Sequence, residues 1–340
     1  VSRDTAEIGH ALDAVRRYQT ELCPELHSRR ITAELLYNRL SPFRWAMRGY
    51  LILGAALLGA ALWEMFGKNR RCAARITGIA AAAVAAVFAW QTFGLGLRWY
   101  VSGHAPWSNA YETMVYVGWA TVLSGLVFAR RSRLAPALAA LMGGVALFVS
   151  NLNWLDPQIT PLVPVLKSYW LMIHVSVVTA SYGFFGICAA CGIASLAATA
   201  FGRNLRELRA INEMAMIVGL ALLTAGIFFG AVWANESWGR YWGWDPKETW
   251  ALITMFAYAL ATHSRHIPRL DGPFAFDVLS VVCFSTVLMT FFGVNYYLSG
   301  LHSYGHSGGV SLTVPLIGAS VVIALIAAAA GRYFKTSKKR

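Results

Sequence analysis

Residues 169–200 read YWLMIHVSVVTASYGFFGICAACGIASLAATA and contain no Asp, Glu, Lys or Arg. A helix needs about 20 consecutive apolar residues to cross a bilayer, so this stretch is long enough to span a membrane. Eight further apolar stretches occur along the chain, with approximate limits 49–66, 76–97, 113–129, 134–150, 214–233, 249–263, 274–298 and 311–331. The sequence therefore predicts an all-α, polytopic integral membrane helix bundle with about nine transmembrane helices.

The overall composition supports the same class of protein. Of the 340 residues, 57% are hydrophobic and only 13% are charged, whereas soluble domains have roughly a quarter charged residues. The net charge of +13 lies mainly at loop ends and in the N-terminal segment. Because no soluble basic patch is interleaved with aromatic residues, we expect contact with anionic membrane lipid and no binding of nucleic acid.

Basic residues concentrate in alternate loops, and loops rich in Lys and Arg stay in the cytoplasm. The predicted cytoplasmic set is Lys68, Arg70, Arg71, Arg75, Arg130, Arg131, Arg133, Arg203, Arg206, Arg209, Arg265, Arg269, Lys335, Lys338, Lys339 and Arg340. The intervening loops carry only Arg98, Lys167, Arg240 and Lys247. This pattern predicts that the N-terminus lies outside and the C-terminus in the cytoplasm, with the loops at 98–112 and 151–168 on the outer side.

Three regions follow from this topology. Residues 1–47 form a mixed-charge extracytoplasmic segment that starts with Val1 and lacks a signal-peptide pattern, so we expect it to continue a longer polypeptide. Residues 48–334 form the transmembrane domain, and residues 335–340 form a basic cytoplasmic tail. Cys188 and Cys191 make a CxxC inside an apolar helix, where thiols usually behave as small hydrophobic groups.

Residues 233–248 read WANESWGRYWGWDPKE and lie between two apolar stretches on the predicted outer side. The four tryptophans, Trp233, Trp238, Trp242 and Trp244, predict a flat aromatic surface suited to a planar ligand. Interleaved polar groups such as Asp245 would fix the orientation of that ligand. The alternative is an ordinary aromatic belt at the membrane interface, although a belt rarely concentrates so many tryptophans in one loop.

Three of the eight histidines lie in or beside apolar stretches, where ionisable groups are functional candidates. His174 and His302 fall on the predicted outer side near the tryptophan segment. Imidazole suits iron, so the pair predicts two axial ligands on opposite faces of a porphyrin. A hydrogen-bonded core role is the alternative for each alone. His263 lies about 27 Å along a helix from Asp245, and both a metal-ligand and an interfacial role remain open there; His10, His27, His104 and His306 have no predicted ligand role.

The motifs match one protein family. They are WGRYWGWD at 238–245, SYWLMIHVSVVTASYG at 168–183, NAYETM at 109–114, DPKETWALIT at 245–254 and FFGVNYYLSGLHSYG at 291–305. The chain resembles the haem-handling cytochrome c assembly proteins with a WWD signature, and in particular the CcsA (ResC) type, over roughly residues 80–310. Members of that type work with a ResB (CcsB) partner and are sometimes fused to it.

The resemblance implies a cytochrome c synthase component of the bacterial cytoplasmic membrane. Haem b would cross the membrane and be joined outside to the CxxCH cysteines of an apocytochrome c. His174 and His302 would be the outer axial ligands, and Asp245 the orienting, catalytic carboxylate beside a platform of Trp233, Trp238, Trp242 and Trp244. His263 would bind iron at an inner site, with its partner ligand on the ResB-type protein.

Two other functions fit parts of the sequence. A haem carrier without ligation activity, similar to CcmC or HemX, shares the tryptophan signature. A structural or electron-transfer membrane subunit would also hold haem with histidines, but such proteins usually bury those histidines in the bundle core. The sequence contains no Ser/His/Asp nucleophile set, phosphate-binding glycine loop or zinc cluster.

Overall fold

The computed structural model describes residues 5–22, 28–66, 70–152, 155–162, 164–298, 300, 302 and 313–337. These residues form helices and connecting loops, without a β-strand in the described ranges. The α-helices are α1 (Thr5–Leu22), α2 (Ser28–Leu40), α3 (Pro42–Phe66), α4 (Arg70–Ser102), α5 (Ala110–Val127), α6 (Leu134–Ser150), α7 (Tyr169–Ala200), α8 (Arg206–Trp238), α9 (Pro246–Thr262), α10 (Pro273–Val282), α11 (Phe284–Leu288), α12 (Val294–Tyr297) and α13 (Thr313–Ser337). Short helical turns are η1 (Pro164–Lys167), η2 (Ser264–His266) and the π-helix η3 (Met289–Gly293).

Among the described residues, helices form most of each predicted apolar stretch, and the all-helical class is confirmed there. Within the part of the chain that the structure describes, six helical segments are long and apolar enough to cross a membrane: Arg29–Glu64, Ala74–Ser102, Tyr169–Ala200, Arg206–Trp238, Pro273–Tyr297 and Leu316–Lys335. These properties are those of a polytopic membrane protein. The shorter α5, α6 and α9 contain 18, 17 and 17 residues, so the total of nine spans and the orientation of the termini stay predictions.

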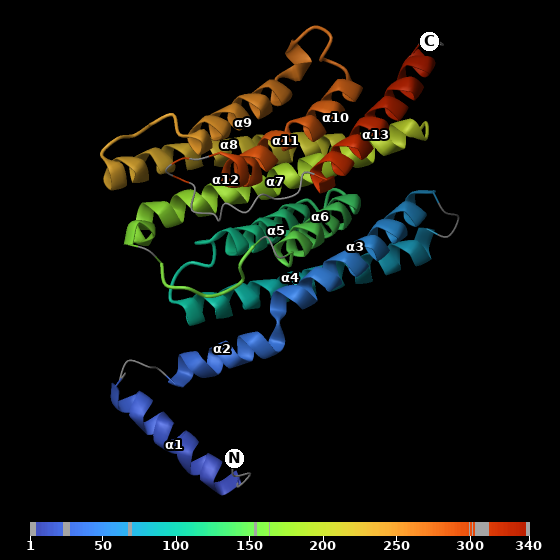
Figure 1. Cartoon of the computed structure of the whole chain (residues 1–340). Helices are drawn as coiled ribbons and strands as arrows, with labels where there is room; N and C mark the ends of the chain where they lie inside the picture. Colours follow the sequence, from blue (N-terminus) through green and yellow to red (C-terminus); the bar gives the residue numbers. More distant parts are fainter. Residues whose placement is uncertain are drawn as a thin grey trace.

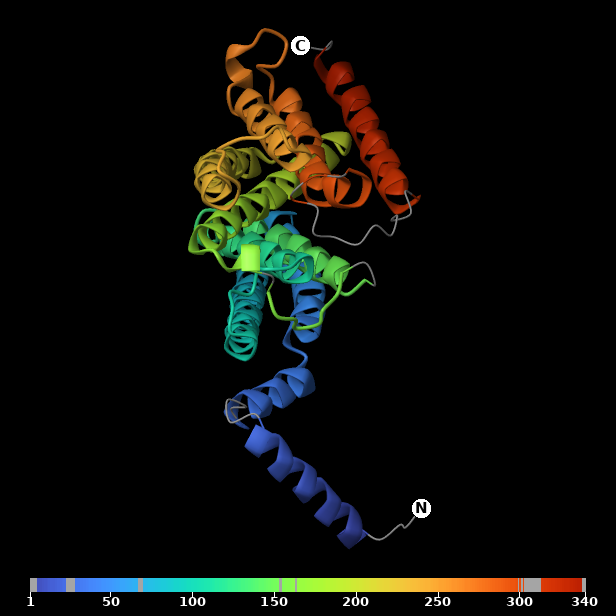
Figure 2. The ribbon, with the colours of Figure 1, turned by 60° about the vertical axis from the view of Figure 1, so that its left-hand side comes forward.

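Helix α7 lies at the centre of the bundle (Figures 1 and 2). It packs against α5 and α6 on one side and against α8, α10 and α13 on the other. Glycine permits one of these close approaches, because a Cβ at Gly183 of α7 would lie 2.7 Å from the backbone nitrogen of Thr121 in α5. Small residues at such crossings are typical of membrane helix packing. The hairpin of α3 and α4 packs beside α6, and α2 packs against α4, while α1 projects away from the bundle (Figure 1).

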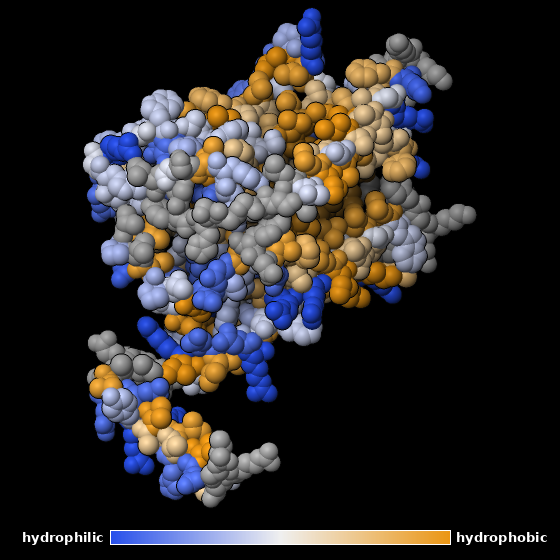
Figure 3. Space-filling view, viewed as in Figure 1, coloured by the Kyte–Doolittle hydropathy of each residue, from blue (hydrophilic) through white to orange (hydrophobic). Residues whose placement is uncertain are grey.

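The loops gather at two opposite ends of the bundle. At one end, Arg133 pairs with Glu64 of α3 at 2.7 Å and Arg265 pairs with Glu213 of α8, so two predicted cytoplasmic loops are each tied to a neighbouring helix. At the other end lie the α4–α5, α6–α7 and α8–α9 connections. Figure 3 shows hydrophilic residues at the left of the view, where α8 meets α9, and a broad band of hydrophobic residues to the right of them.

Two helices extend further than the sequence predicts. Arg98 is assigned to a loop by its charge, but it lies in α4, which continues to Ser102 because a buried carboxylate compensates the arginine. The tryptophan segment at 233–248 is not one loop: α8 continues to Trp238 and α9 begins at Pro246. Gly239 ends α8 with a φ of 71°, a conformation that glycine adopts without strain.

Some predicted features lie outside the described residues. These are Val1, His27, Lys68, His306 and the tail residues Lys338, Lys339 and Arg340.

Candidate functional site

A cavity of about 430 Å³ opens at the end of the bundle that carries the α4–α5 connection. Its volume lies in the range of roughly 300–1,000 Å³ that is usual for cofactor and ligand sites. His174, His302, Lys247 and Asn295 are among its polar lining residues. A smaller cavity of about 90 Å³ shares His174, His302 and Lys247, and is also lined by Trp242. The structure thus brings the two predicted outer histidines to one cavity.

The His174 side chain is fixed by α8. Its Nδ1 lies 2.7 Å from the carbonyl oxygen of Gly226, and because a carbonyl only accepts, Nδ1 carries the proton and Nε2 keeps its lone pair. Gly230, one turn further along α8, leaves room for the ring: a Cβ there would lie 2.6 Å from Cε1 and 2.7 Å from Nδ1 of His174. The two glycines therefore position the imidazole, and Nε2 is the nitrogen that remains for a ligand.

The His302 side chain is fixed by a carboxylate in the same manner. Its Nδ1 lies 3.1 Å from Oδ1 of Asp245, which again leaves the lone pair on Nε2. A carboxylate behind a ligating histidine orients the ring and raises its basicity as a ligand. Burial lowers the pKa of His302, and the neighbouring Asp245 opposes this shift. Since the pKa lies below the ordinary value, the neutral imidazole that binds metals predominates at pH 7.

Asp245 is itself fixed as the N-cap of α9. Its Oδ1 accepts the backbone N–H of Lys247 at 3.0 Å, and Glu248 Oε2 accepts the backbone N–H groups of Asp245 and Gly243 at 3.2 and 2.8 Å. This capping box satisfies backbone donors at the helix start. Asp245 therefore positions the His302 ring, and its predicted orienting contact with the ligand stays a prediction.

The four tryptophans form two pairs instead of one flat surface. Trp233 and Trp238 contact each other at an interplanar angle of 65°, and both rings contact His302. Trp242 and Trp244 meet at 87°, and Trp244 is 70% exposed with a φ of 57°. The pairs separate because Trp233 and Trp238 belong to α8, whereas the other two follow the turn at Gly239.

Lys247 and Asn295 are site residues that the sequence analysis did not predict. Lys247 Nζ donates to Asn295 Oδ1 at 2.8 Å, from α9 to α12. The π-helical turn η3 precedes α12, and such turns occur often at functional sites. Burial lowers the pKa of Lys247 to about 8, with Asp245 acting in the opposite direction, so the amine is mostly charged at pH 7. The lysine was visible in the DPKE motif, but its contact with a residue 48 positions away was not.

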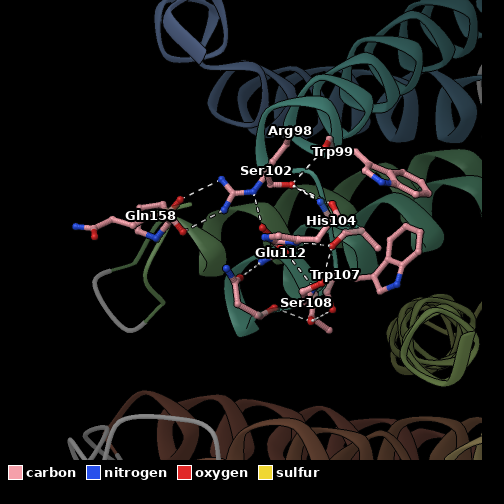
Figure 4. Close-up of polar contacts among 12 residues, drawn as sticks. Arg98, Trp99, Ser102, His104, Trp107, Ser108, Glu112 and Gln158 are labelled. Atoms are coloured by element: carbon pink, nitrogen blue, oxygen red, sulfur yellow. Dashed lines mark hydrogen bonds and ion pairs between the residues drawn. The ribbon is translucent and has the colours of Figure 1, made fainter. Parts of the chain in front are cut away.

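A buried ion pair holds the rim of the cavity (Figure 4). The side chains of Arg98 and Glu112 are both 0% exposed, with Nε and Oε1 at 2.9 Å. Arg98 Nη1 also donates to the Tyr37 hydroxyl of α2 and to the carbonyl of Pro157, each at 3.0 Å. Glu112 Oε2 accepts the backbone N–H of Ser108 at 2.9 Å. The pair thus joins α2, α4, α5 and the loop before η1.

Trp107 links this rim to α7. Its Nε1 donates to the carbonyl of Met172 at 3.1 Å, two residues before His174, and the Trp107 side chain lines the cavity. His104 lies in the same loop, where Nδ1 is 3.2 Å from the carbonyl of Ala105. His104 does not line either cavity described above.

His263 lies at the opposite end of the bundle, as predicted. It is the C-cap residue of α9, its side chain is exposed, and its Nδ1 contacts the carbonyl of Ala259 at 2.9 Å. In the described part of the chain, no group of three or more His, Cys, Asp or Glu side chains gathers around a metal-sized site. An iron site at His263 remains a proposal that requires a ligand from another chain.

The donor set at the cavity fits haem. Two imidazoles present Nε2 lone pairs, which is the axial set of a bis-histidine haem. The indole Nε1 groups of Trp233 and Trp242 are buried, and neither has a hydrogen-bond partner among the described residues. Buried donors are normally satisfied, so the indole of Trp242, which lines the smaller cavity, is suited to an acceptor on a bound ligand. Apolar walls, two imidazole nitrogens with lone pairs and an unused indole donor together suit a planar ligand with acidic groups.

Comparisons with known proteins show what this chain is similar to. The family described as cytochrome C assembly protein matches residues 107–302, which run from Trp107 to His302. The chain is 44% identical over 311 residues to protein NrfI of Wolinella succinogenes, covering 86% of this chain and 34% of NrfI. It is 34% identical over 296 residues to the cytochrome c biogenesis protein CcsA of Parasynechococcus marenigrum, covering 76% of this chain and 94% of that protein.

A further relative is the CcsA protein of Chlamydomonas reinhardtii, at 36% identity over 227 residues, or 62% of this chain and 63% of that protein. The chain thus spans about a third of the length of NrfI but nearly the whole of the cyanobacterial CcsA. The similarity extends over the helices that build the cavity.

Proposed function

This chain belongs to the cytochrome c assembly protein family, and on that premise we propose that it holds haem b between His174 and His302 for attachment to an apocytochrome c. The observation that carries the proposal is the matched pair of imidazoles at one cavity. Each has Nδ1 engaged, by Gly226 and by Asp245 respectively, and each keeps Nε2 for iron. The names of the NrfI and CcsA relatives support a role in cytochrome c biogenesis.

The proposed reaction is thioether formation, in which a cysteine thiol of CxxCH adds across a haem vinyl group. A carbon–sulfur and a carbon–hydrogen bond form, the sulfur–hydrogen bond and the vinyl double bond are lost, and no oxidant is consumed. The protein therefore needs to hold the haem in place and present its edge, which is catalysis by orientation. His174 and His302 would supply that restraint, while Asp245 would keep the His302 ring aligned.

The client would approach from the end of the bundle that carries the α8–α9 connection. Tyr241 and Trp244 are 62% and 70% exposed in that connection. Large exposed aromatic rings are typical of protein contact sites. One histidine must finally give way to the histidine of CxxCH, so we infer that ligation is firm enough to retain haem and weak enough to exchange.

Topology and partner complete the proposal. We infer that the cavity faces outward in a bacterial cytoplasmic membrane, with the basic loops in the cytoplasm. A ResB-type membrane protein would act with this chain, supply the second ligand at His263 and complete the route by which haem crosses the bilayer. The long NrfI relative is compatible with a fused arrangement, since this chain matches only 34% of it.

The experiment is a maturation assay in a bacterium that lacks its own cytochrome c assembly genes. This chain is produced with a ResB-type partner and a reporter apocytochrome c, and covalent haem is measured on the denatured reporter. His174→Ala and His302→Ala should each abolish the product, and added imidazole should partly restore it. The control is His266→Ala, because His266 is exposed at the opposite end of the bundle. Normal maturation in both single variants would exclude the assigned ligands.

A further inference from the structure

A cationic side chain lies in the wall of an otherwise largely apolar cavity. Lys247 lines the cavity together with Leu171, Val175, Val178 and Phe291. A charge surrounded by apolar groups is costly unless it is paired. Among the described residues, Nζ of Lys247 donates one hydrogen bond, to Oδ1 of Asn295. Because an ammonium group has three donors, two remain for another acceptor.

Asn295 is fixed so that it directs its oxygen at this lysine. Its Nδ2 donates to the carbonyl of Phe291 at 2.7 Å, which leaves Oδ1 for Nζ of Lys247 at 2.8 Å. The π-helical turn from Met289 to Gly293 lies immediately before it. Lys247 is thus held by a neutral acceptor, which restrains the ammonium without neutralising its charge.

The nearest carboxylates have other hydrogen-bond partners. Asp245 lies two residues earlier and stabilises the positive charge of Lys247, but its Oδ1 accepts from His302 and from a backbone N–H. Glu248 Oε2 accepts from two backbone N–H groups. The ammonium group therefore has capacity for an anion that enters the cavity from outside.

We propose that Lys247, held by Asn295, binds a carboxylate of the ligand in this cavity and selects porphyrins with free propionates over their esters. The inference rests on the proposed haem site between His174 and His302 and adds the group that fixes the rotation of the haem about its iron axis. In this arrangement the two histidines bind iron irrespective of the side groups, and Lys247 distinguishes those side groups.

The test compares haem b with its dimethyl ester, in which both propionates are neutral. Each is titrated into the purified full chain in detergent, and binding is followed by the Soret absorbance and by quenching of tryptophan fluorescence. The variants are Lys247→Met, which keeps the length of the side chain, and Lys247→Arg, which keeps the charge. The matched control is Lys167→Met, because Lys167 is exposed at the same end of the bundle and lines neither cavity.

Wild type and Lys167→Met should bind haem about tenfold or more tightly than the ester, the usual size of one charged hydrogen bond. Lys247→Met should lose this preference and bind both forms with similar affinity, whereas Lys247→Arg should retain it. A wild type that binds both forms equally would overturn the role of Lys247 while leaving the haem site intact. A Lys247→Met variant that still prefers haem over the ester would also overturn the role of Lys247 and leave the haem site intact. Binding of neither form by wild type would overturn the haem site and this inference together.

Discussion

Gly230→Ala should displace a predicted iron ligand without changing its chemistry. The added Cβ would lie 2.6 Å from Cε1 of His174, whereas ordinary contacts begin at 3.4 Å. The imidazole must therefore move by about 0.8 Å, the difference between these distances. A shift of that size along the hydrogen bond to Gly226 would lengthen it from 2.7 Å to about 3.5 Å, where hydrogen bonding is largely lost.

We expect Gly230→Ala to weaken haem binding by roughly 10- to 100-fold, the usual effect of disturbing the groups that orient a metal ligand. The assay is a titration of haem into the purified chain, with the absorption spectrum recorded at each step. Added imidazole should restore part of the bis-histidine spectrum, because it replaces the displaced ligand. The control is Gly96→Ala, since a Cβ added at Gly96 of α4 would meet none of the described residues within 4 Å. Wild-type affinity and an unchanged spectrum in Gly230→Ala would refute this positioning of His174.

Three further predictions concern the groups around the site. Arg98→Met should destabilise the protein by about 3–5 kcal/mol because it leaves Glu112 buried and uncompensated. Thermal unfolding should show a smaller loss of stability in Arg98→Met/Glu112→Leu. Equal losses of stability in the two variants would contradict this. Asp245→Asn, which preserves a capping side chain, should lower haem affinity about tenfold with little change in melting temperature, whereas a parallel fall in both would indicate a purely structural role. His263→Ala should leave the spectrum of haem at the outer cavity unchanged, and a lost spectrum would place the haem elsewhere.

The positions of the helices are readable from the sequence because burial in a membrane requires continuous apolar runs. Residues 169–200 are the clearest case, since the predicted stretch and α7 have the same limits. The ends of helices are less readable where polar groups are compensated in space. Arg98 is an example: its charge suggests a loop, but Glu112 and three further acceptors allow it to lie inside the bundle.

The candidate site likewise has a part that the sequence predicts and a part that it does not. Topology alone predicts that His174 and His302 lie at the same end of the bundle, because the order of the apolar stretches places both on the outer side. The contact between Lys247 and Asn295 cannot, since it depends on how α9 packs against η3 and α12. The space that Gly230 leaves for His174 likewise depends on the close packing of α7 on α8. Sequence spacing contains no information about such distances.

The geometry of the tryptophans illustrates a third limit. Their density in residues 233–248 identifies the segment, but the orientation of each ring depends on whether its residue belongs to a helix or a turn. Trp233 is 1% exposed in α8, while Trp244 is largely exposed after Gly239. Four neighbouring aromatic residues therefore divide between the site interior and the surface.

The most direct test of the haem site is the absorption spectrum of the purified chain, recorded before and after reduction with dithionite. Wild type is compared with the double variant His174→Ala/His302→Ala after both have been exposed to haem. We predict a reduced, six-coordinate bis-histidine spectrum in wild type and its loss in the double variant. The same six-coordinate spectrum in both proteins would contradict the account, because iron would then be held by residues other than His174 and His302.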